Sequence, residues 1–405
     1  MYTLTDRAAD GTVCTRLGIT VRCGMSDTDA WYRVADAGSI PSPTLLFYPE
    51  RIRSNTAEAV RVAGSPQRLR PHVKTNKCPQ VVSIMREHGI SRFKCATLAE
   101  AAMLAAAGVT DIVIAYPMVG PNLVLLTELC RTYPGASFRP TVESVPTLEL
   151  LGSAAAKAGL VIEAVLDLDV GMHRTGASSV EEALALYRRI DAHAHLRPGG
   201  IHAYDGHVHE RDLTRRREIV GPTIRTVREM ADTLRADGVE IPRIIAGGTP
   251  TFPCYADDAP EFELSPGTCF LHDWGYLEGY PDLEFSPAAL ILGRVVSRPG
   301  AGLITIDVGS KAIAADPAGP RGTILNLPNA EPLGQSEEHW VFRLSARDAA
   351  RMPSSGEEVY VLPRHICPSV ALHAQAVVVD GSGSATETWP ITARDRAIKG
   401  MRVHP

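Results

Sequence analysis

The sequence predicts a β/α barrel that is followed by a C-terminal antiparallel β domain. Between about residues 67 and 265, short apolar runs alternate with amphipathic stretches, and eight such repeats over ~200 residues are what a closed parallel barrel requires. After residue 285 the helical periodicity mostly ends, and short β-like runs punctuated by Gly, Pro and Asp replace it, as in an antiparallel β domain. We therefore divide the chain into an N-terminal segment (1–40), a barrel (41–285) and a β domain (286–405).

The predicted barrel strands are apolar runs that end in polar, small or ionisable residues. They are Arg68–Lys74, Phe93–Ala96, Asp111–Ala115, Ser137–Val142, Val161–Leu168, Gly200–Tyr204, Arg243–Ala246 and Glu261–Leu264. Between them, apolar residues at i, i+3 and i+4 with charges on the opposite face predict helices. The clearest are Ala99–Ala107, Pro146–Ala158, Val180–His193 and Thr214–Asp237. An open doubly wound sheet is the alternative, but no Gly-x-Gly-x-x-Gly turn follows the first strand, which counts against it.

The β domain is predicted from five runs with strand-like composition. They are Ala288–Ser297, Gly302–Asp307, Trp340–Leu344, Glu358–Leu362 and Ala374–Asp380. Residues 1–40 follow neither the barrel nor the β pattern, and we expect them to pack on the β domain.

The composition excludes several classes of function. The chain has 405 residues, 45% hydrophobic content and a formal net charge of −5, without a run of five like charges, so a nucleic-acid surface is not indicated. No apolar stretch approaches the ~20 residues of a membrane span, and the N-terminus lacks the pattern of a secretory signal. Eight scattered cysteines do not form a disulfide framework. We expect a cytoplasmic enzyme that acts on a small molecule.

Lys74 is the first candidate catalytic residue, because active sites of such barrels lie at the carboxyl ends of the strands. It ends the first predicted strand, in the stretch RPHVKT. A solvated surface lysine is the plainer interpretation. At the end of an apolar barrel strand, however, the lysine points into the mouth, where desolvation lowers its pKa and makes the amine a nucleophile for Schiff-base chemistry.

Two glycine-rich loops are candidates for binding a phosphate group. They read AGGTPT at 246–251 and SPGT at 265–268, after the seventh and eighth strands. Tight turns need glycine in any case, but these two loops are the usual phosphate site of such a barrel. A lysine together with a phosphate-binding loop suggests pyridoxal 5′-phosphate (PLP) as cofactor.

Further ionisable residues follow the fifth and sixth strands. Arg174 is an ordinary surface arginine in one interpretation, but in the barrel mouth it would bind a phenolic oxygen or a carboxylate. His207 and His209 follow the sixth strand. One of them is expected to be structural, whereas the other is a candidate for proton transfer.

His365 and Cys367 are a candidate metal pair in the β domain. In an extended strand, residues two apart point the same way, so both side chains could bind one ion. Pro368 favours extended geometry for the cysteine before it. Most His-x-Cys pairs are accidental, so the spacing alone does not establish a metal site.

Together these stretches resemble the metal-dependent fold-type III PLP enzymes. This group contains D-threonine aldolase and D-serine dehydratase, and its barrel is similar to that of alanine racemase. The matching stretches are RPHVKT, LDVGMHRTG, YDGHVH, AGGTPT, HICP and WPITARD. They stand in the family's order across roughly residues 40–395, so the resemblance covers nearly the whole chain.

The resemblance implies a role for each candidate residue. Lys74 would carry PLP, and a divalent metal ion (Zn²⁺, Mn²⁺ or Mg²⁺) would be bound by His365 and Cys367. The residues around the cofactor would be His72, Arg174, Tyr204, Gly247, Gly248 and Thr249. The resemblance also implies a homodimer that completes each site from the neighbouring chain.

Two positions depart from the family pattern. A second histidine commonly follows the lysine motif, where this chain has Asn76. The aldolase branch usually pairs its metal histidine with an aspartate, whereas Cys367 matches the dehydratase branch; a thiolate favours Zn²⁺. The histidines after the sixth strand, in contrast, are similar to those of the aldolases.

The resemblance implies a reaction on β-hydroxy-D-amino acids with two possible outcomes. If His207 or His209 takes the β-hydroxyl proton, the Cα–Cβ bond breaks and the products are glycine and an aldehyde. If Lys74 takes the Cα proton, the products are ammonia and a 2-oxo acid. We favour aldol cleavage. An amino-acid racemase and a non-enzymatic PLP-carrier protein are the alternatives, although the β domain with its HICP stretch argues against the carrier.

Overall fold

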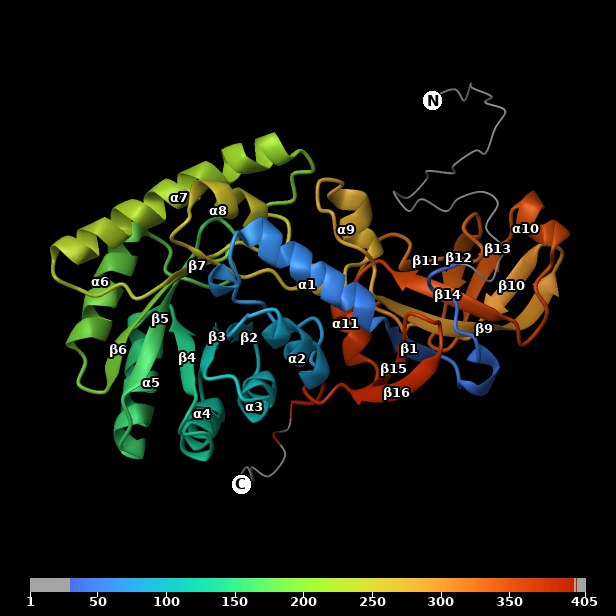
Figure 1. Cartoon of the computed structure of the whole chain (residues 1–405). Helices are drawn as coiled ribbons and strands as arrows, with labels where there is room; N and C mark the ends of the chain where they lie inside the picture. The colour runs from blue at the N-terminus through green and yellow to red at the C-terminus, as the bar shows by residue number, and fades with distance from the viewer. Residues whose placement is uncertain (1–29, 397, 399–405) are drawn as a thin grey trace.

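The computed structural model describes residues 30–396 and 398, and it contains two sheets that lie side by side (Figure 1). The first sheet is parallel, and its seven strands follow one another in chain order. They are β2 (Arg92–Cys95), β3 (Asp111–Pro117), β4 (Ser137–Val142), β5 (Ile162–Leu168), β6 (Leu196–Ala203), β7 (Ile244–Ala246) and β8 (Glu263–Leu264). The predicted barrel is thereby confirmed, with seven regular strands in place of eight.

The predicted first strand is irregular, but its backbone still closes the barrel between β8 and β2. On one side, the Arg70 N–H donates to the Leu264 carbonyl at 2.7 Å. On the other side, the Lys94 N–H donates to the Pro71 carbonyl and the Val73 N–H to the Lys94 carbonyl, both at 2.9 Å. Pro71 has no N–H to donate, so a regular ladder cannot form across this segment.

Helices connect the barrel strands, and all four helices predicted from periodicity are present to within one residue at each end. The helices are α1 (Pro49–Ala63), α2 (Pro79–Glu87), α3 (Leu98–Ala106), α4 (Pro121–Thr132), α5 (Val145–Ala158), α6 (Val180–Ala192), α7 (Leu213–Ala236) and α8 (Phe252–Asp258). Side-chain caps explain several of the starts. Ser144 accepts from the Thr147 N–H and forms a capping box, and Gly159 ends the same helix in the left-handed region.

The second sheet is mixed and has nine strands. They are β1 (Thr44–Phe47), β9 (Ala289–Gly300), β10 (Leu303–Ile306), β11 (Gly322–Ile324), β12 (Glu331–Gln335), β13 (Trp340–Arg343), β14 (Glu358–Pro363), β15 (Gln375–Val379) and β16 (Ala385–Pro390). All five strands predicted here are present. Three short helices accompany the sheet and the mouth of the barrel: α9 (Trp274–Gly279), α10 (Ala346–Ala350) and α11 (Ile366–Ala371).

The segment before the barrel contributes to the second sheet. β1 pairs antiparallel with β9 and parallel with β15, so residues 44–47 belong to this sheet although the sequence-based division placed them in the barrel range. Within the described part of the N-terminal segment, Tyr32 and Ile40 pack in one apolar cluster with Leu290 and Leu362. Residues 1–29 lie outside the described residues.

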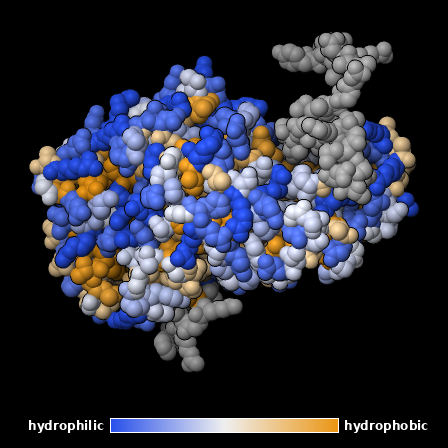
Figure 2. All heavy atoms as spheres, viewed as in Figure 1, coloured by the Kyte–Doolittle hydropathy of each residue, from blue (hydrophilic) through white to orange (hydrophobic). Residues whose placement is uncertain are grey.

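The face of the molecule shown in Figure 2 carries little continuous apolar area. The face shown in Figure 2 is mostly hydrophilic, with apolar residues in small separate groups, which is ordinary for a globular protein. Among the described residues, no helix is both long and apolar enough to cross a bilayer.

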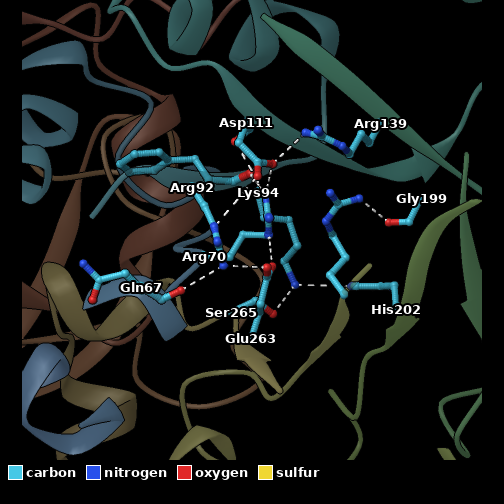
Figure 3. Close-up of polar contacts among 12 residues, drawn as sticks. Gln67, Arg70, Arg92, Lys94, Asp111, Arg139, Gly199, His202, Glu263 and Ser265 are labelled. Carbon is cyan, nitrogen blue, oxygen red and sulfur yellow. Dashed lines mark hydrogen bonds and ion pairs between the residues drawn. The ribbon is translucent and has the colours of Figure 1, made fainter. Parts of the chain in front are cut away.

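A ring of ion pairs holds the end of the barrel where the strands begin (Figure 3). The fully buried Arg70 guanidinium contacts Glu263 at 2.5 Å and Asp111 at 2.7 Å. Arg139 contacts Asp111 and Glu163, each at 2.7 Å. Burial alone would raise the pKa of Asp111, but Arg70 and Arg139 outweigh it and lower that pKa below its usual value. Alternating charges from successive strands therefore tie the segment around Arg70 into the barrel.

We predict that Arg70→Met lowers the free energy of unfolding by about 3 kcal/mol, because it leaves two largely buried carboxylates without this partner. Arg188 pairs with Asp237 at the surface, at 2.6 Å, and Arg188→Met is the matched control, with an expected loss below about 1 kcal/mol. Urea unfolding of the wild type and both variants gives the comparison. Equal losses in the two variants would show that the buried ring does not stabilise the barrel.

Candidate active site

Lys74 lies at the mouth of the barrel beside two other residues that the sequence predicted. It is half-buried and directly follows the segment that closes the barrel. Its Nζ lies 5.8 Å from the centre of the Tyr204 ring, and the Arg174 guanidinium carbon lies 5.4 Å from the same centre. Tyr204 follows β6 and Arg174 lies in the loop after β5. Three strand ends therefore bring an amine, a guanidinium and an aromatic ring together.

Glycines make room for the Tyr204 ring. A Cβ on Gly206 would overlap the ring, and one on Gly248 would lie 3.2 Å from its Cε2 atom. At least one glycine of the predicted phosphate loop, Gly248, is therefore explained by close contact with the aromatic ring. Gly247 has a φ of +73°, a backbone conformation that favours glycine.

Thr249 joins the two glycine-rich loops. Its hydroxyl oxygen accepts from the N–H groups of Gly267 and Thr268, both at 3.1 Å. The loops after β7 and β8 are therefore one compact unit at the barrel mouth, against Tyr204 and Thr75.

The charges at this mouth fit PLP. The cofactor carries an anionic phosphate and a phenolic oxygen, and an anionic ligand needs cationic partners that carboxylates have not already neutralised. Among the described residues, no ion pair joins the Lys74 or the Arg174 side chain to a carboxylate. The two free cations, the threonine hydroxyl and the close-packed glycines match the chemistry of that group.

Beneath the mouth lies a buried polar array that sequence analysis missed (Figure 3). Lys94, on β2, donates to the Ser265 hydroxyl at 2.5 Å, and its Nζ lies 3.4 Å from His202 Nε2. His202 Nδ1 lies 2.7 Å from Asp167 Oδ1. Burial alone would raise the pKa of Asp167, but His202 outweighs it and lowers that pKa below its usual value. The available signal was a lysine between Phe93 and Cys95, at an inward-facing position of a barrel strand.

His72 is also buried, directly below the mouth. The Lys74 backbone N–H donates to His72 Nδ1 at 3.3 Å. Burial, together with the nearby Lys74 ammonium, lowers the pKa of this histidine well below its usual value. His72 is therefore neutral here, and its predicted contact with the cofactor stays a prediction.

His207 and His209 lie at the exposed rim of the mouth. His207 packs against Gly171, where an added Cβ would lie 2.9 Å from the histidine Nε2. His209 Nδ1 lies 3.3 Å from the Tyr280 hydroxyl. The assignment of one of the two histidines as the catalytic base stays a prediction.

His365 and Cys367 lie together, but not for the reason that the sequence suggested. They are not in an extended strand: His365 precedes α11, and Cys367 lies in its first turn. The two side chains nevertheless lie near enough for each to shift the pKa of the other. The Cys367 sulfur lies 3.1 Å from the Thr75 hydroxyl and 3.5 Å from that of Thr268. Since Thr75 follows Lys74, the pair reaches from the second sheet to the barrel mouth.

The pKa values of His365 and Cys367 are shifted in opposite directions. Burial alone would lower the pKa of His365, but Cys367 and Asp316 outweigh it and raise that pKa to about 9. Burial alone would raise the pKa of the Cys367 thiol, but His365 and Lys74 lower it below its usual value. His365 Nδ1 lies 2.5 Å from Asp316 Oδ2, a contact that sequence analysis missed.

Cysteine and histidine side chains are ligands that Zn²⁺ prefers. Across residues 30–396 and 398, however, no three His, Cys, Asp or Glu side chains form a group that could hold a metal ion. A metal ion bound by this pair would have two protein ligands among the described residues, so substrate or water would have to complete the coordination.

Asp273 fixes the metal pair relative to the barrel. It is fully buried, and its Oδ2 accepts from the Ile366 N–H at 2.9 Å while its Oδ1 accepts from the Tyr276 N–H at 3.0 Å. The Gly275 N–H donates to the Arg364 carbonyl at 3.1 Å. A side chain at Gly275 would lie 2.6 Å from that carbonyl oxygen. The start of α9 is therefore clamped to the segment that carries His365 and Cys367.

Comparison with known proteins agrees with this geometry. The family model for the alanine racemase N-terminal domain matches residues 49–271, more than half of the chain, and a serine dehydratase domain model matches residues 288–379. The chain belongs to the alanine racemase-like family. Its predicted resemblance to fold-type III PLP enzymes is thereby confirmed.

Individual members of this family are similar over most of their length. The chain is 31% identical to D-threonine aldolase from Arthrobacter sp. over 330 residues, 80% of this chain and 85% of that protein. It is 26% identical over 377 residues to D-threo-3-hydroxyaspartate dehydratase from Delftia sp., which covers 87% and 97% of the two chains. The crystal structure of D-threonine aldolase from Filomicrobium marinum superposes with a TM-score of 0.82 at 26% identity, over 90% of this chain and 98% of that one.

In this alanine racemase-like chain, Asp273 makes stability depend on pH. Burial raises its pKa from 3.8 to about 6, so the folded protein holds this proton more tightly than the unfolded chain. That contribution is complete below pH 4 and is lost as the pH rises through 6, a change of about 3 kcal/mol. We predict that Asp273→Asn, which stays neutral, lacks this loss when urea unfolding is measured between pH 4 and pH 7.

Glu278→Gln is the control for this prediction. Glu278 lies on the same helix and pairs with Arg364 at the surface, at 2.9 Å, so its pH profile should run parallel to that of the wild type. A parallel profile for Asp273→Asn as well would contradict the assignment.

Proposed function

We propose that the protein is a PLP- and divalent-metal-dependent lyase that cleaves β-hydroxy-D-amino acids into glycine and an aldehyde. The observation that carries the proposal is the juxtaposition of Lys74 with the His365–Cys367 pair, through Thr75, at one barrel mouth. Relatives named as aldolases support it: besides D-threonine aldolase, 3-hydroxy-D-aspartate aldolase from Paracoccus denitrificans is 25% identical over 372 residues, 89% of this chain and 94% of that protein.

Different residues at the mouth would bind different parts of the cofactor. Lys74 would hold PLP through its amine, and Arg174 would donate to the phenolic oxygen. Tyr204 and His72 would line the ring, and the phosphate would be held by residues of the first glycine-rich loop, Gly247, Gly248 and Thr249. When bound, PLP supplies an electron sink for the electron pair of the broken bond.

His365 and Cys367 would hold the divalent ion, and the thiolate favours Zn²⁺ over Mn²⁺ or Mg²⁺. Such an ion supplies Lewis acidity and orients the substrate's β-hydroxyl. A D-threo-3-hydroxyaspartate dehydratase has been solved as a cysteine-to-alanine mutant in a metal-free form.

Proton transfer decides between the two reactions. His207 or His209, at the rim, would take the β-hydroxyl proton, which releases the aldehyde and leaves glycine. Lys74 would instead take the Cα proton in the second candidate reaction, elimination to ammonia and a 2-oxo acid. Cys367 favours this second candidate, because the family's dehydratase branch has a cysteine there. A racemase is the less favoured alternative, since it would need no metal. The homodimer and the cytoplasmic location also stay predictions.

The products distinguish the reactions. With PLP and Zn²⁺, we expect D-threonine to give glycine and acetaldehyde in equal amounts, measured separately from ammonia and 2-oxo acid. Lys74→Ala should lower the rate at least about 10³-fold, whereas Lys157→Ala, at an exposed helical lysine, should leave it unchanged. Ammonia and a 2-oxo acid as the main products would reject aldol cleavage in favour of elimination.

The metal pair makes a separate prediction. We expect a chelator, His365→Ala and Cys367→Ala each to abolish turnover of D-threonine. Cys367→Asp should restore part of it with Mn²⁺ rather than Zn²⁺, because a carboxylate is a harder ligand than a thiolate. Full activity of His365→Ala would contradict the metal role. Activity that survives a chelator, with Cα–H exchange and no carbon product, would indicate a racemase.

A further inference from the structure

Lys94 is a buried cation that the proposed reaction does not use. It lies on β2 with 1% of its surface exposed. Figure 3 shows its side chain reaching Ser265 on one side and His202 on the other. The ammonium donates to the Ser265 hydroxyl at 2.5 Å and lies 3.4 Å from His202 Nε2. Both partners lie at the carboxyl ends of their strands, just below the mouth.

Hydrogen bonds extend from Lys94 to the loops that would hold the cofactor. In one direction, the Ser265 hydroxyl donates to the Gly247 carbonyl at 3.1 Å, in the first glycine-rich loop. In the other direction, His202 contacts Asp167 at 2.7 Å. The Thr175 hydroxyl, next to Arg174, donates to the same carboxylate at 2.8 Å. One line of contacts therefore crosses the barrel, with Lys94 at its centre.

The Tyr204 ring packs against two residues of this line of contacts, His202 and Lys94. Its ring is nearly parallel to that of His202, with 10° between the planes and 6.3 Å between the centres. The Lys94 ammonium lies 5.1 Å from the centre of the tyrosine ring, within the range of a cation–π contact. The same ring lies within 6 Å of Lys74 and Arg174.

Packing alone gives no reason for a lysine at this position. Burial, together with the nearby Lys74 ammonium, lowers the pKa of Lys94 to about 7, because a charged amine is unfavourable away from water and beside a like charge. A well-packed apolar side chain of similar volume is commonly neutral or stabilising in place of a buried charge. Perturbed buried groups of this kind concentrate at functional sites.

We propose that Lys94 is a positioning residue of the cofactor site, which ties the glycine-rich loop to the Arg174 loop and holds the Tyr204 ring between them. This inference rests on the proposed function only in that PLP binds at Lys74. It makes Lys94, Ser265, His202 and Asp167 the floor of the site, although none of them needs to touch the substrate.

The test is Lys94→Met, which keeps the volume and removes the charge. We expect the cofactor-free variant to unfold at the same urea concentration as the wild type, or at a higher one. Its dissociation constant for PLP should rise about tenfold, and the visible absorption band of the bound cofactor should shift. Ser265→Ala removes one partner only and should change both properties in the same direction, so the test holds even if Lys94→Met does not fold.

Arg139→Met is the matched control, because Arg139 is also a buried barrel cation but lies in the ring at the opposite end, outside the segment that carries Lys74. It should lower stability without changing the PLP dissociation constant or the absorption band of the folded protein. The inference is overturned if Lys94→Met lowers stability while both cofactor properties stay as in the wild type. A wild type that binds no PLP would instead refute the proposed function itself, and the inference with it.

Discussion

Closure of the parallel barrel by an irregular segment is the constraint on which the site depends. Pro71 prevents a regular strand, yet the backbone on either side of it pairs with both β8 and β2. At one end, Arg70 is anchored by buried carboxylates. At the other end, the segment delivers Lys74 to the mouth and places Thr75 against Cys367. A short stretch of chain thus connects barrel stability, the lysine proposed to bind PLP and the pair proposed to bind a metal ion.

Positively charged side chains from several strands lie at the mouth. The acidic side chains near them lie below the mouth or to its side and contact other groups. Asp167 lies beneath the mouth, where His202 is its partner. Asp273 lies to the side and accepts backbone N–H groups instead of pairing with a cation. Lys74 and Arg174 therefore stay available for an anionic ligand. This separation of charges explains why a cofactor with a phosphate fits the site.

Sequence periodicity predicted the features that depend on local patterning. The four helices that it identified, α3, α5, α6 and α7, agree closely, because apolar spacing and caps such as Ser144 act within one segment. The pairing of β1 with β9 was not predictable, since strand partners far apart in sequence are chosen by packing. His365 and Cys367 were predicted from an extended geometry that is wrong, yet they meet on a helical turn. Lys94 and Asp273 were missed because a single buried polar residue has no sequence period.

The central claim is that Lys74 is the amine that binds PLP. It is tested most directly by incubating the protein with PLP, reducing with borohydride and mapping the modified peptide by mass spectrometry. The account predicts one phosphopyridoxyl group per chain, on Lys74, in the peptide that contains the RPHVKT stretch. Modification of a different lysine, or scattered modification of exposed lysines with Lys74 unmodified, would contradict it.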